Sequence, residues 1–335
     1  MFDESHRLKD TGTQRYKRAL KLANRVARVV CMTGTPAPER LLDVFGAATI
    51  ATRGKAFGHA FSTFRARFFY PIDPNGHMWR PFPNTSEELV RVMEPWLRRV
   101  ENTAKDGLLR VMDYRITPPP QLVKIYKAFQ KDFFVGLEGG EMLLAESAAT
   151  LSTKLQQLSS GFVYAEDNTI RFSDFKLEAL KDLLEDLQGA QAIIVFTFVE
   201  QLLRLKDVFP ELGYLAGETS KADAERWINA FNDGSLRLLA IHPASAGEGL
   251  NLHLGGAHHL IYLSLPWSAG QYDQVNGRLA RFGQQKTVVV HRFLAESTLD
   301  ETIAGALETK ADVQQHLLEC AARAKNIRKG PKTKK

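Results

Sequence analysis

The chain has 335 residues, of which 44% are hydrophobic, and it carries a formal net charge of +6 at pH 7. A chain of this length and composition has room for about two domains with a sizeable core, which excludes a disordered tail or linker. No apolar run approaches the roughly 18 residues of a membrane span, and the first residues lack a secretory signal pattern. We therefore expect a cytoplasmic protein with no membrane partner.

The two cysteines, Cys31 and Cys320, are too few for a disulfide framework or a cysteine-rich metal site. The excess of basic residues favours a polyanionic partner such as nucleic acid. Much of this charge lies in the last residues, "ARAKNIRKGPKTKK". That segment fits a solvated disordered tail as well as it fits a dedicated DNA contact.

The first third of the chain begins with the tetrapeptide "DESH" at residues 3–6. Periodicity predicts a basic amphipathic helix over residues 15–27, and "RVVCMTGTP" then predicts a short buried strand and a turn. Residues 36–115 are irregular and rich in aromatic residues, with one clear helical pattern at residues 87–100. We interpret this segment as an elaborated connection rather than an independent core. The aromatic rings of residues 57–82 could contact DNA bases, but burial beneath the long connection is the preferred interpretation.

The rest of the chain predicts an α/β fold. After "ITPPP", residues 121–161 show helical spacing and are interpreted as a hinge or brace. From residue 176 to about residue 299, helical patterns alternate with short apolar strands, "AIIVF", "GYLAG", "LRLLAI", "HLIYLSL" and "TVVVHRF". Such an alternation is typical of a parallel sheet that is covered on both faces.

Two loops at strand ends carry candidate site residues, because ligands of such sheets bind beyond the carboxyl ends of the strands. In "HPASAGEGLNLH", Gly247 and Gly249 allow a close backbone approach, while Ser245 and Asn251 offer hydrogen bonds. A tight turn without a ligand is the alternative interpretation.

The second loop, "PWSAGQYDQVNGRLARFGQ", leads into a helix with Ser268 as the expected N-cap. Gln274, Arg278 and Arg281 fall on one side of this helix. Arginine forks match phosphate oxygens and can stabilise the charge of a transferring phosphoryl group. An arginine pair that bridges to surface carboxylates is the alternative for an isolated Arg-x-x-Arg.

The segments "DESH", "TGTP", "SAGEGLNL" and "QVNGRLARFGQ", in this order, resemble motifs II, III, V and VI of superfamily-two helicases. The resemblance is to the Swi/Snf-like ATPases, above all those of phages and prophages, and it covers residues 2–315. It implies two RecA-like lobes that clamp Mg-ATP between them and move along duplex DNA. Residues 1–115 would form a truncated first lobe, 116–170 a helical hinge, 171–315 the second lobe and 316–335 a basic tail.

The resemblance also implies roles for single residues of the first lobe. Asp3 would hold Mg²⁺, Glu4 would polarise the attacking water, and His6 would couple this site to the other lobe. The further coupling residues would be Thr33, Gly34 and Thr35.

In the second lobe, Arg278 and Arg281 would reach the phosphates, with Arg281 the better candidate for an arginine finger. Gln274 and Gln284 would support their helix. The nucleotide cleft would be lined by Gly247, Glu248 and Gly249, and the DNA backbone would be contacted by Ser245, Asn251 and Thr197. Glu248 departs from the small residue or histidine often found at this position in the family.

A P-loop, Gly-x-x-x-x-Gly-Lys followed by Ser or Thr, is needed to cradle the phosphates. No such sequence occurs in the 335 residues. We therefore expect a truncated first lobe with uncovered apolar faces and no ATP turnover by this chain alone. Three explanations stay open: a start placed inside a longer reading frame, a separate polypeptide that carries the P-loop half, or decay of the gene.

Two functions follow from these patterns. The first is the C-terminal portion of an ATP-dependent DNA helicase or translocase, with ATP and Mg²⁺ as cofactors and duplex DNA as partner, in a bacterial host cell if a phage encodes it. The second is a non-catalytic DNA-binding or regulatory fragment of such a protein. A histidine-based metal hydrolase is set aside, because His258 and His259 lack ligand-like spacing.

Overall fold

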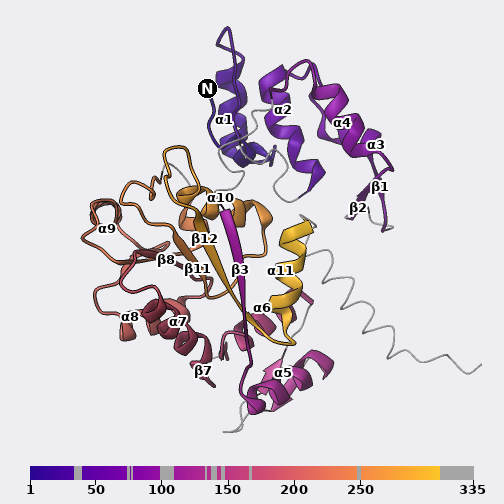
Figure 1. The fold of residues 1–335 in the computed structure, drawn as a ribbon. Coiled ribbons are helices and arrows are strands. Elements are labelled where there is room, and N and C mark those ends of the chain that lie inside the picture. Colours follow the sequence, from indigo (N-terminus) through magenta and orange to yellow (C-terminus); the bar gives the residue numbers. More distant parts are fainter. Residues whose placement is uncertain are drawn as a thin grey trace, which may run out of the picture. The chain divides into compact units, whose positions relative to one another are not determined.

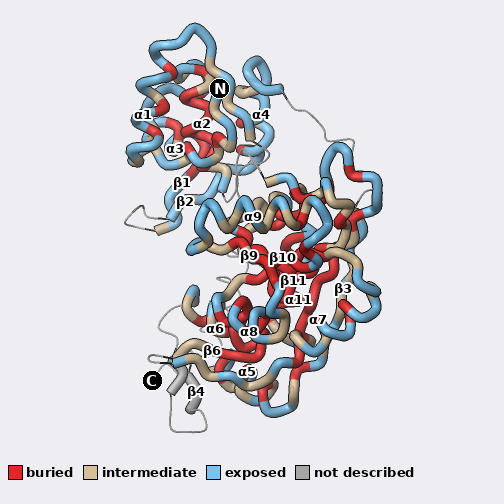
Figure 2. Tube along the Cα trace, turned by 90° about the vertical axis from the view of Figure 1, so that its left-hand side faces the viewer, coloured by how far each residue is buried: buried red, intermediate tan, exposed pale blue. Residues whose placement is uncertain are grey.

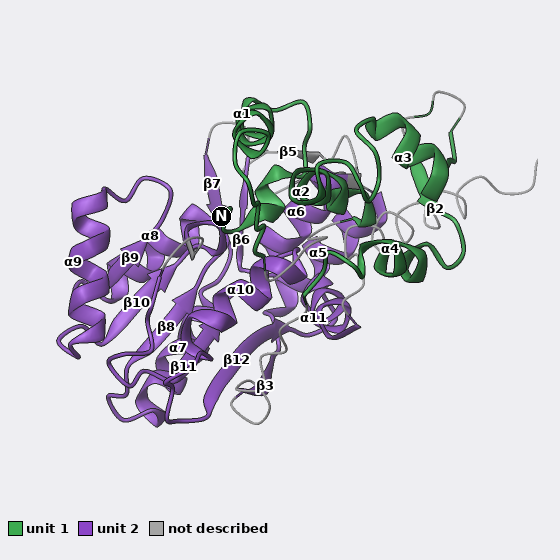
Figure 3. Ribbon diagram, turned by 90° about the horizontal axis from the view of Figure 1, so that it is seen from above, with its two compact units in different colours: residues 1–101 green, residues 102–335 purple. Residues whose placement is uncertain are grey.

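The computed structural model describes residues 1–33, 40–73, 76, 78–98, 109–132, 134–136, 142–144, 148–165, 168–246 and 250–309. The chain divides into two compact units, Met1–Glu101 and Asn102–Lys335 (Figure 3). Each unit has apolar clusters of its own. Residue 115, the predicted boundary of the first lobe, lies inside a strand of the second unit, β3 (Leu109–Ile116).

The second unit is built on a six-stranded sheet in the order β3-β12-β11-β8-β10-β9, and all its pairings are parallel (Figure 1). Besides β3, its strands are β8 (Ala192–Val195), β9 (Gly213–Leu215), β10 (Leu238–Ile241), β11 (His259–Tyr262) and β12 (Val288–Ala295). Strands β8 and β10 are buried along their whole length. The predicted α/β fold with a parallel sheet is confirmed.

Alternate side chains of each strand enter two separate cores. In β8, Ile193 and Val195 belong to one cluster, and Ala192 and Ile194 belong to the other. The first core is covered by residues of α5 (Pro120–Asp132), α6 (Ala148–Leu158), α9 (Lys221–Asn232), α10 (Ala269–Leu279) and α11 (Leu299–Thr309). The second is covered by α7 (Phe175–Asp186) and α8 (Val199–Val208). This two-sided burial explains why the strands are continuous apolar runs in the sequence.

The segment that precedes α7 belongs to the second unit. Strand β3 pairs with β12 over eight residues, from Leu109↔Val288 to Ile116↔Ala295. Helices α5 and α6 contribute Leu122, Phe129 and Leu158 to the core beneath the sheet. Two small antiparallel pairs complete the unit, β4 (Phe134–Gly136) with β5 (Met142–Leu144) and β6 (Phe162–Tyr164) with β7 (Thr169–Arg171). Among the helices of the described residues, none is long and apolar enough to cross a membrane.

The first unit is mostly helical. Its elements are η1 (Ser5–Leu8), α1 (Gln14–Ala23), η2 (Leu41–Asp43), α2 (Val44–Thr52), α3 (Phe61–Phe68), β1 (Phe69–Pro71), β2 (Trp79–Pro81) and α4 (Thr85–Met93). Helix α1 ends four residues before the predicted end. In the turn that follows, the carbonyls of Val26 and Ala27 accept hydrogen bonds from Arg53. Helix α4 ends at Met93, seven residues early, because Pro95 cannot continue it.

The strand predicted in "RVVCM" is reduced to one parallel bridge between Phe2 and Cys31. The prediction that this segment is buried is wrong, because Val30 and Met32 are 51% and 40% exposed. With one short partner, the segment has little to pack against. The same observation agrees with the expected uncovered apolar faces, to which Leu22 on α1 adds another exposed side chain.

Aromatic side chains form a core within residues 44–93. Phe45, Phe57, Phe64 and Phe68 are buried and their rings contact one another at centroid distances of 5.0–5.7 Å. The predicted burial of the aromatic rings of residues 57–82 is confirmed for Phe57, Phe64 and Phe68, whereas Tyr70 and Phe82 are 37% and 43% exposed. The interpretation of this segment as a connection without a core is wrong, because α2, α3 and α4 all contribute to the cluster (Figure 2).

Candidate functional site

The acidic pair, Asp3 and Glu4, directly follows Phe2, which forms a parallel bridge with Cys31. The Phe2 N–H donates to the Val30 carbonyl over 2.8 Å, and the Phe2 carbonyl accepts from the Met32 N–H over 2.8 Å. Asp3 and Glu4 come next, at the end of this pairing. Glu4 has φ 47° and ψ 47°, a left-handed conformation that is uncommon for residues other than glycine. The chain turns sharply there and enters η1.

His6 joins the acidic motif to the segment that resembles motif III. Its Nδ1 lies 3.2 Å from Glu4 Oε2 and 3.1 Å from Thr33 Oγ1. A coupling role for His6 and Thr33 requires that these two segments of the first unit contact each other. The other predicted coupling residues, Gly34 and Thr35, lie outside the described residues.

Asp3 is exposed, and its Oδ1 accepts the Glu4 N–H over 2.9 Å. Among the described residues, no group of three or more His, Cys, Asp or Glu side chains could hold a metal ion. Mg²⁺ in nucleotide sites is typically held by one or two carboxylates together with phosphates and water. A lone exposed carboxylate such as Asp3 therefore fits a cation that arrives with a nucleotide, and it does not fit a permanent metal site.

In the second unit, the two predicted arginines converge on one short segment. Ser268 caps α10 by accepting the Gln271 N–H, as predicted. Arg278 is buried, and its Nη1 donates to the Leu250 carbonyl over 3.4 Å. Arg281 lies beyond the end of α10 and is exposed, and its Nη1 contacts the Leu250 carbonyl at 3.3 Å and Asn251 Oδ1 at 2.5 Å.

Leu250 and Asn251 directly follow the glycine-containing loop. Gly247, Glu248 and Gly249 themselves lie outside the described residues. Burial lowers the pKa of the neighbouring His253, and the positive charge of Arg281 lowers it further. Both effects disfavour a positive charge on His253 beside Arg281.

Gln284 secures the segment that follows α10. Its Nε2 donates to the carbonyl of Ala257 over 2.9 Å, and its Oε1 accepts the Lys286 N–H over 3.1 Å. Its side chain is nearly buried, so its amide is engaged with backbone groups. Gln274 lies on α10, one turn before Arg278, and is half-buried. The support of the arginine helix by Gln274 and Gln284 stays a prediction.

Thr197 and Ser245 lie at the carboxyl ends of the adjacent strands β8 and β10. His242 connects them: its Nε2 lies 3.2 Å from the Thr197 carbonyl, and its own carbonyl accepts the Ser245 N–H over 2.8 Å. Gln201 Oε1 accepts the Thr197 N–H over 2.9 Å. The short helix η4 (Pro243–Ala246), which includes Ser245, packs against α10. The structure thus brings Thr197 and Ser245 together on the sheet edge.

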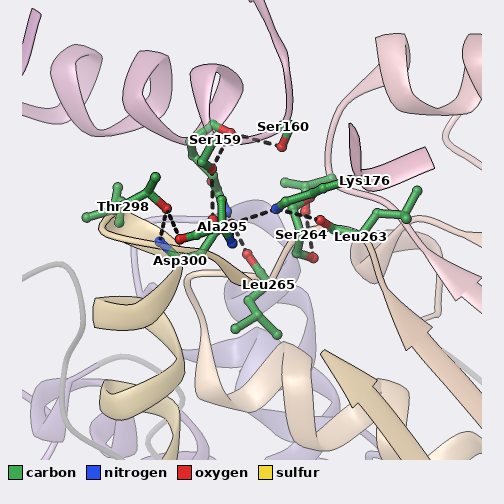
Figure 4. A network of polar contacts seen from close by, with 12 residues as sticks. Ser159, Ser160, Lys176, Leu263, Ser264, Leu265, Ala295, Thr298 and Asp300 are labelled. Carbon is green, nitrogen blue, oxygen red and sulfur yellow. Dashed lines mark hydrogen bonds and ion pairs between the residues drawn. The ribbon is translucent and has the colours of Figure 1, made fainter. Parts of the chain in front are cut away.

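A buried polar network that the sequence interpretation did not identify supports this edge (Figure 4). Lys176 Nζ lies 2.5 Å from Asp300 Oδ2 and donates to the Leu263 carbonyl over 2.9 Å. Asp300 also accepts from Ser159 Oγ over 2.8 Å. The next residue after Leu263, Ser264, donates to Gln201 Oε1 over 3.0 Å. The network therefore reaches the glutamine that holds Thr197.

A signal for this network exists in the sequence. Lys176 stands on the apolar stripe of α7 with Leu180, Leu183 and Leu184, and Asp300 stands on that of α11 with Ile303, Ala304 and Leu307. A charged residue at a position where helical periodicity requires an apolar one indicates a buried partner. The side chains of Lys176 and Asp300 are only 5% and 2% exposed.

Comparisons with known proteins bear on the same segments. The helicase conserved C-terminal domain matches residues 175–283. Putative protein p41 of Acyrthosiphon pisum secondary endosymbiont phage 1 is 29% identical, over 96% of this chain and 72% of that protein.

Two further relatives are longer proteins. SWI/SNF-related matrix-associated actin-dependent regulator of chromatin subfamily A-like protein 1 of Xenopus tropicalis is 24% identical over 93% of this chain. Putative ATP-dependent helicase/translocase YwqA of Bacillus subtilis is 22% identical over 95% of this chain. The chain spans 32% and 35% of the lengths of these two proteins, respectively.

Proposed function

We propose that this chain is part of an ATP-dependent translocase that acts on duplex DNA in the cytoplasm of a bacterial host. The chain is related to the SWI/SNF-like superfamily-two helicases, and its residues 175–283 match the helicase conserved C-terminal domain. The observation that carries this proposal is the convergence of Arg278 and Arg281 on Leu250 and Asn251, beside the glycine-containing loop. An arginine pair held by backbone and amide oxygens is positioned rather than mobile, as phosphate recognition requires.

Each residue has a role in this proposal. Asp3 would hold the Mg²⁺ that accompanies ATP, which when bound would supply neutralisation of phosphate charge. Glu4 polarises the attacking water, and the contact of His6 with Glu4 and Thr33 couples the acidic pair to the rest of the first unit. Arg281, exposed and held by Asn251, stabilises the charge that develops on the transferred phosphoryl group.

On the second unit, we propose that Thr197, Ser245 and Asn251 contact the DNA backbone, and that the nucleotide-cleft residues are Gly247, Glu248, Gly249, Gln274 and Gln284. The contacts of His242 with Thr197 and Ser245 support this arrangement, since they hold two hydroxyl-bearing residues on one edge of the sheet. Side-chain hydroxyls and amides at such positions are common donors to phosphate oxygens.

The phosphate cradle comes, in this proposal, from a P-loop that the 335 residues do not include. It is supplied either by a longer form of the same polypeptide or by a separate polypeptide. Without it, the acidic pair and the arginines have no phosphate held against them, so the chain alone hydrolyses ATP very slowly.

The test is ATP hydrolysis by the purified chain with duplex DNA, alone and with a polypeptide that carries a P-loop half added in trans. We expect no DNA-stimulated hydrolysis by the chain alone and a clear rate after the addition. Arg281→Ala should lower that rate by about 10³-fold or more, by analogy with arginine fingers. Arg226→Ala, which removes an exposed arginine paired with Asp223 on α9, serves as the matched control and should leave the rate unchanged. DNA-stimulated hydrolysis by the chain alone that disappears in Arg281→Ala would overturn the expectation that the chain needs the added P-loop half.

The second candidate function is a DNA-binding or regulatory fragment without catalysis. The observation that favours it is the absence of a P-loop sequence from the chain. Such a fragment would bind DNA with a steep salt dependence, and neither ATP nor the added P-loop half would change its affinity. A nucleotide-dependent change in DNA affinity after complementation argues against this candidate.

A further inference from the structure

A basic surface covers the outer face of α1 and the turn that follows it. Residues 11–38 contain no Asp or Glu but six basic residues: Arg15, Lys17, Arg18, Lys21, Arg25 and Arg28. All six are exposed. We call these six residues the α1 basic surface. Within the described ranges, no ion pair joins any of the six to a carboxylate.

The fold fixes the direction in which this surface faces. Tyr16, Ala19 and Ala23 of α1 are buried in a cluster with Leu8 and Ile50, so the opposite side of the helix faces solvent (Figure 2). Lys17, Arg18 and Lys21 lie on that opposite side, because each turn of the helix returns to the same face after 3.6 residues. The buried face keeps the helix in place while the basic face stays accessible.

The turn after the helix is held in the same region by Arg53. Its guanidinium donates to the carbonyls of Val26 and Ala27, which lie between Arg25 and Arg28. Like charges three and four residues apart on a helix repel each other, as Lys17 and Lys21 do here. Six unpaired positive charges on a fixed scaffold therefore favour binding of a polyanion.

We propose that the α1 basic surface binds the phosphate backbone of duplex DNA, as a contact separate from the second-unit residues Thr197, Ser245 and Asn251. The choice of duplex DNA rests on the proposed function, and the residues themselves support it. The apolar face of α1 is buried, so the helix cannot insert into a membrane. Tyr16, the one aromatic residue of α1, is also buried, so no stacking platform for single-stranded bases is present on this helix.

Contacts of this kind carry no sequence information, because lysine and arginine that face phosphates position the duplex without reading bases. A translocase needs contacts of this type, since it must hold every sequence that it passes. The α1 basic surface would therefore contribute affinity and salt dependence, and it would leave ATP chemistry to other residues.

The experiment measures binding of the full chain to two unrelated duplexes by fluorescence anisotropy at several salt concentrations. Arg18→Gln with Lys21→Gln removes two charges from the surface. Loss of two phosphate contacts should reduce the slope of log K against log salt by about 1.8, equally for both duplexes. Lys181→Gln with Lys221→Gln, which neutralises two exposed lysines of the second unit, is the control of equal net charge and should leave the slope unchanged.

A second pair, Arg15→Gln with Arg28→Gln, repeats the test with residues outside the middle of α1, in case the first pair fails to fold. Unchanged slopes for a folded variant of either pair overturn the proposal. So does a loss of binding to polyglutamate or to RNA with no loss for duplex DNA, which would assign the surface to a different partner. Arg281→Ala should change the slope by no more than the loss of one phosphate contact would. A failure of the ATP-site proposal is therefore seen in the hydrolysis rate, and a failure of this proposal is seen in the slope.

Discussion

Lys176 and Asp300 form an ion pair from which water is almost entirely excluded. Such a pair adds little stability by itself, but removal of one partner leaves a buried charge without compensation. We expect Lys176→Met to lower the free energy of unfolding by about 3–5 kcal/mol, measured by urea denaturation of the full chain. Lys181→Met on the exposed side of the same helix is the control, and removal of both charges with Asp300→Leu should recover part of the loss. A change below about 1 kcal/mol for Lys176→Met would contradict this account.

A second prediction at the residue scale concerns two histidines in contact. His259 Nδ1 lies 3.0 Å from His291 Nε2, and His291 Nδ1 lies 3.1 Å from the hydroxyl of Tyr114. Burial lowers the pKa of His259 to about 4, with further lowering by His258, His291 and Lys286, and burial lowers the pKa of His291 to about 4. Histidine in the unfolded chain has a pKa of about 6.5. As the pH is lowered, the unfolded chain therefore takes up protons at a higher pH than the folded chain does.

This difference in pKa between the folded and the unfolded chain makes the free energy of unfolding depend on pH. Stability is fully present above about pH 6.5 and falls as the pH is lowered toward 4, because protonation favours the unfolded chain. We expect the free energy of unfolding to be lower at pH 5 than at pH 7, and His291→Gln to reduce this difference. His59→Gln, at an exposed position of the first unit, should leave it unchanged. Equal pH dependence in the wild type and His291→Gln would count against the explanation.

At the scale of elements, close packing of α2 against η1 places the acidic motif. A Cβ added to Gly46 of α2 would lie 1.9 Å from the Leu8 carbonyl oxygen, at the end of η1. Backbone at that distance cannot yield easily, so Gly46→Ala should displace η1 and lower the melting temperature. Gly305→Ala on α11 is the matched control, since nothing lies within 4 Å of its added Cβ. That change should raise stability by about 0.5–1 kcal/mol through helix propensity. Similar effects of both changes would show that α2 does not position η1.

The elements of the second unit were predictable because their apolar runs are short and separated by helices with an apolar stripe. Strands β8 and β10 are buried on both faces, and nothing but a parallel sheet satisfies that pattern. The first unit was less predictable. Helices α2 and α3 carry many aromatic and small residues, which weakens helical periodicity.

At the scale of the whole molecule, the candidate site residues fall into two sets on separate units. Asp3, Glu4, His6 and Thr33 belong to the first unit, and the arginines with Asn251 belong to the second. The resemblance to the helicase motifs predicted which residues belong to each set. It could not predict that His242 joins Thr197 to Ser245, or that Asn251 holds Arg281, because these contacts depend on how strands and loops distant in sequence meet.

The place of β3 sets the extent of the second folding unit. Arg292 on β12 is 2% exposed and forms two hydrogen bonds with Asp113 on β3, at 2.6 and 2.8 Å. The conserved domain, residues 175–283, includes neither of these residues. A polypeptide cut at the limits of that domain would lose both strands. One cut at residue 171 would keep Arg292 and its 2.7 Å contact with Glu308, but it would lose both hydrogen bonds to Asp113 and the pairing with β3. The conserved domain is therefore shorter than the folding unit that contains it, because that unit also includes β3, which starts at Leu109.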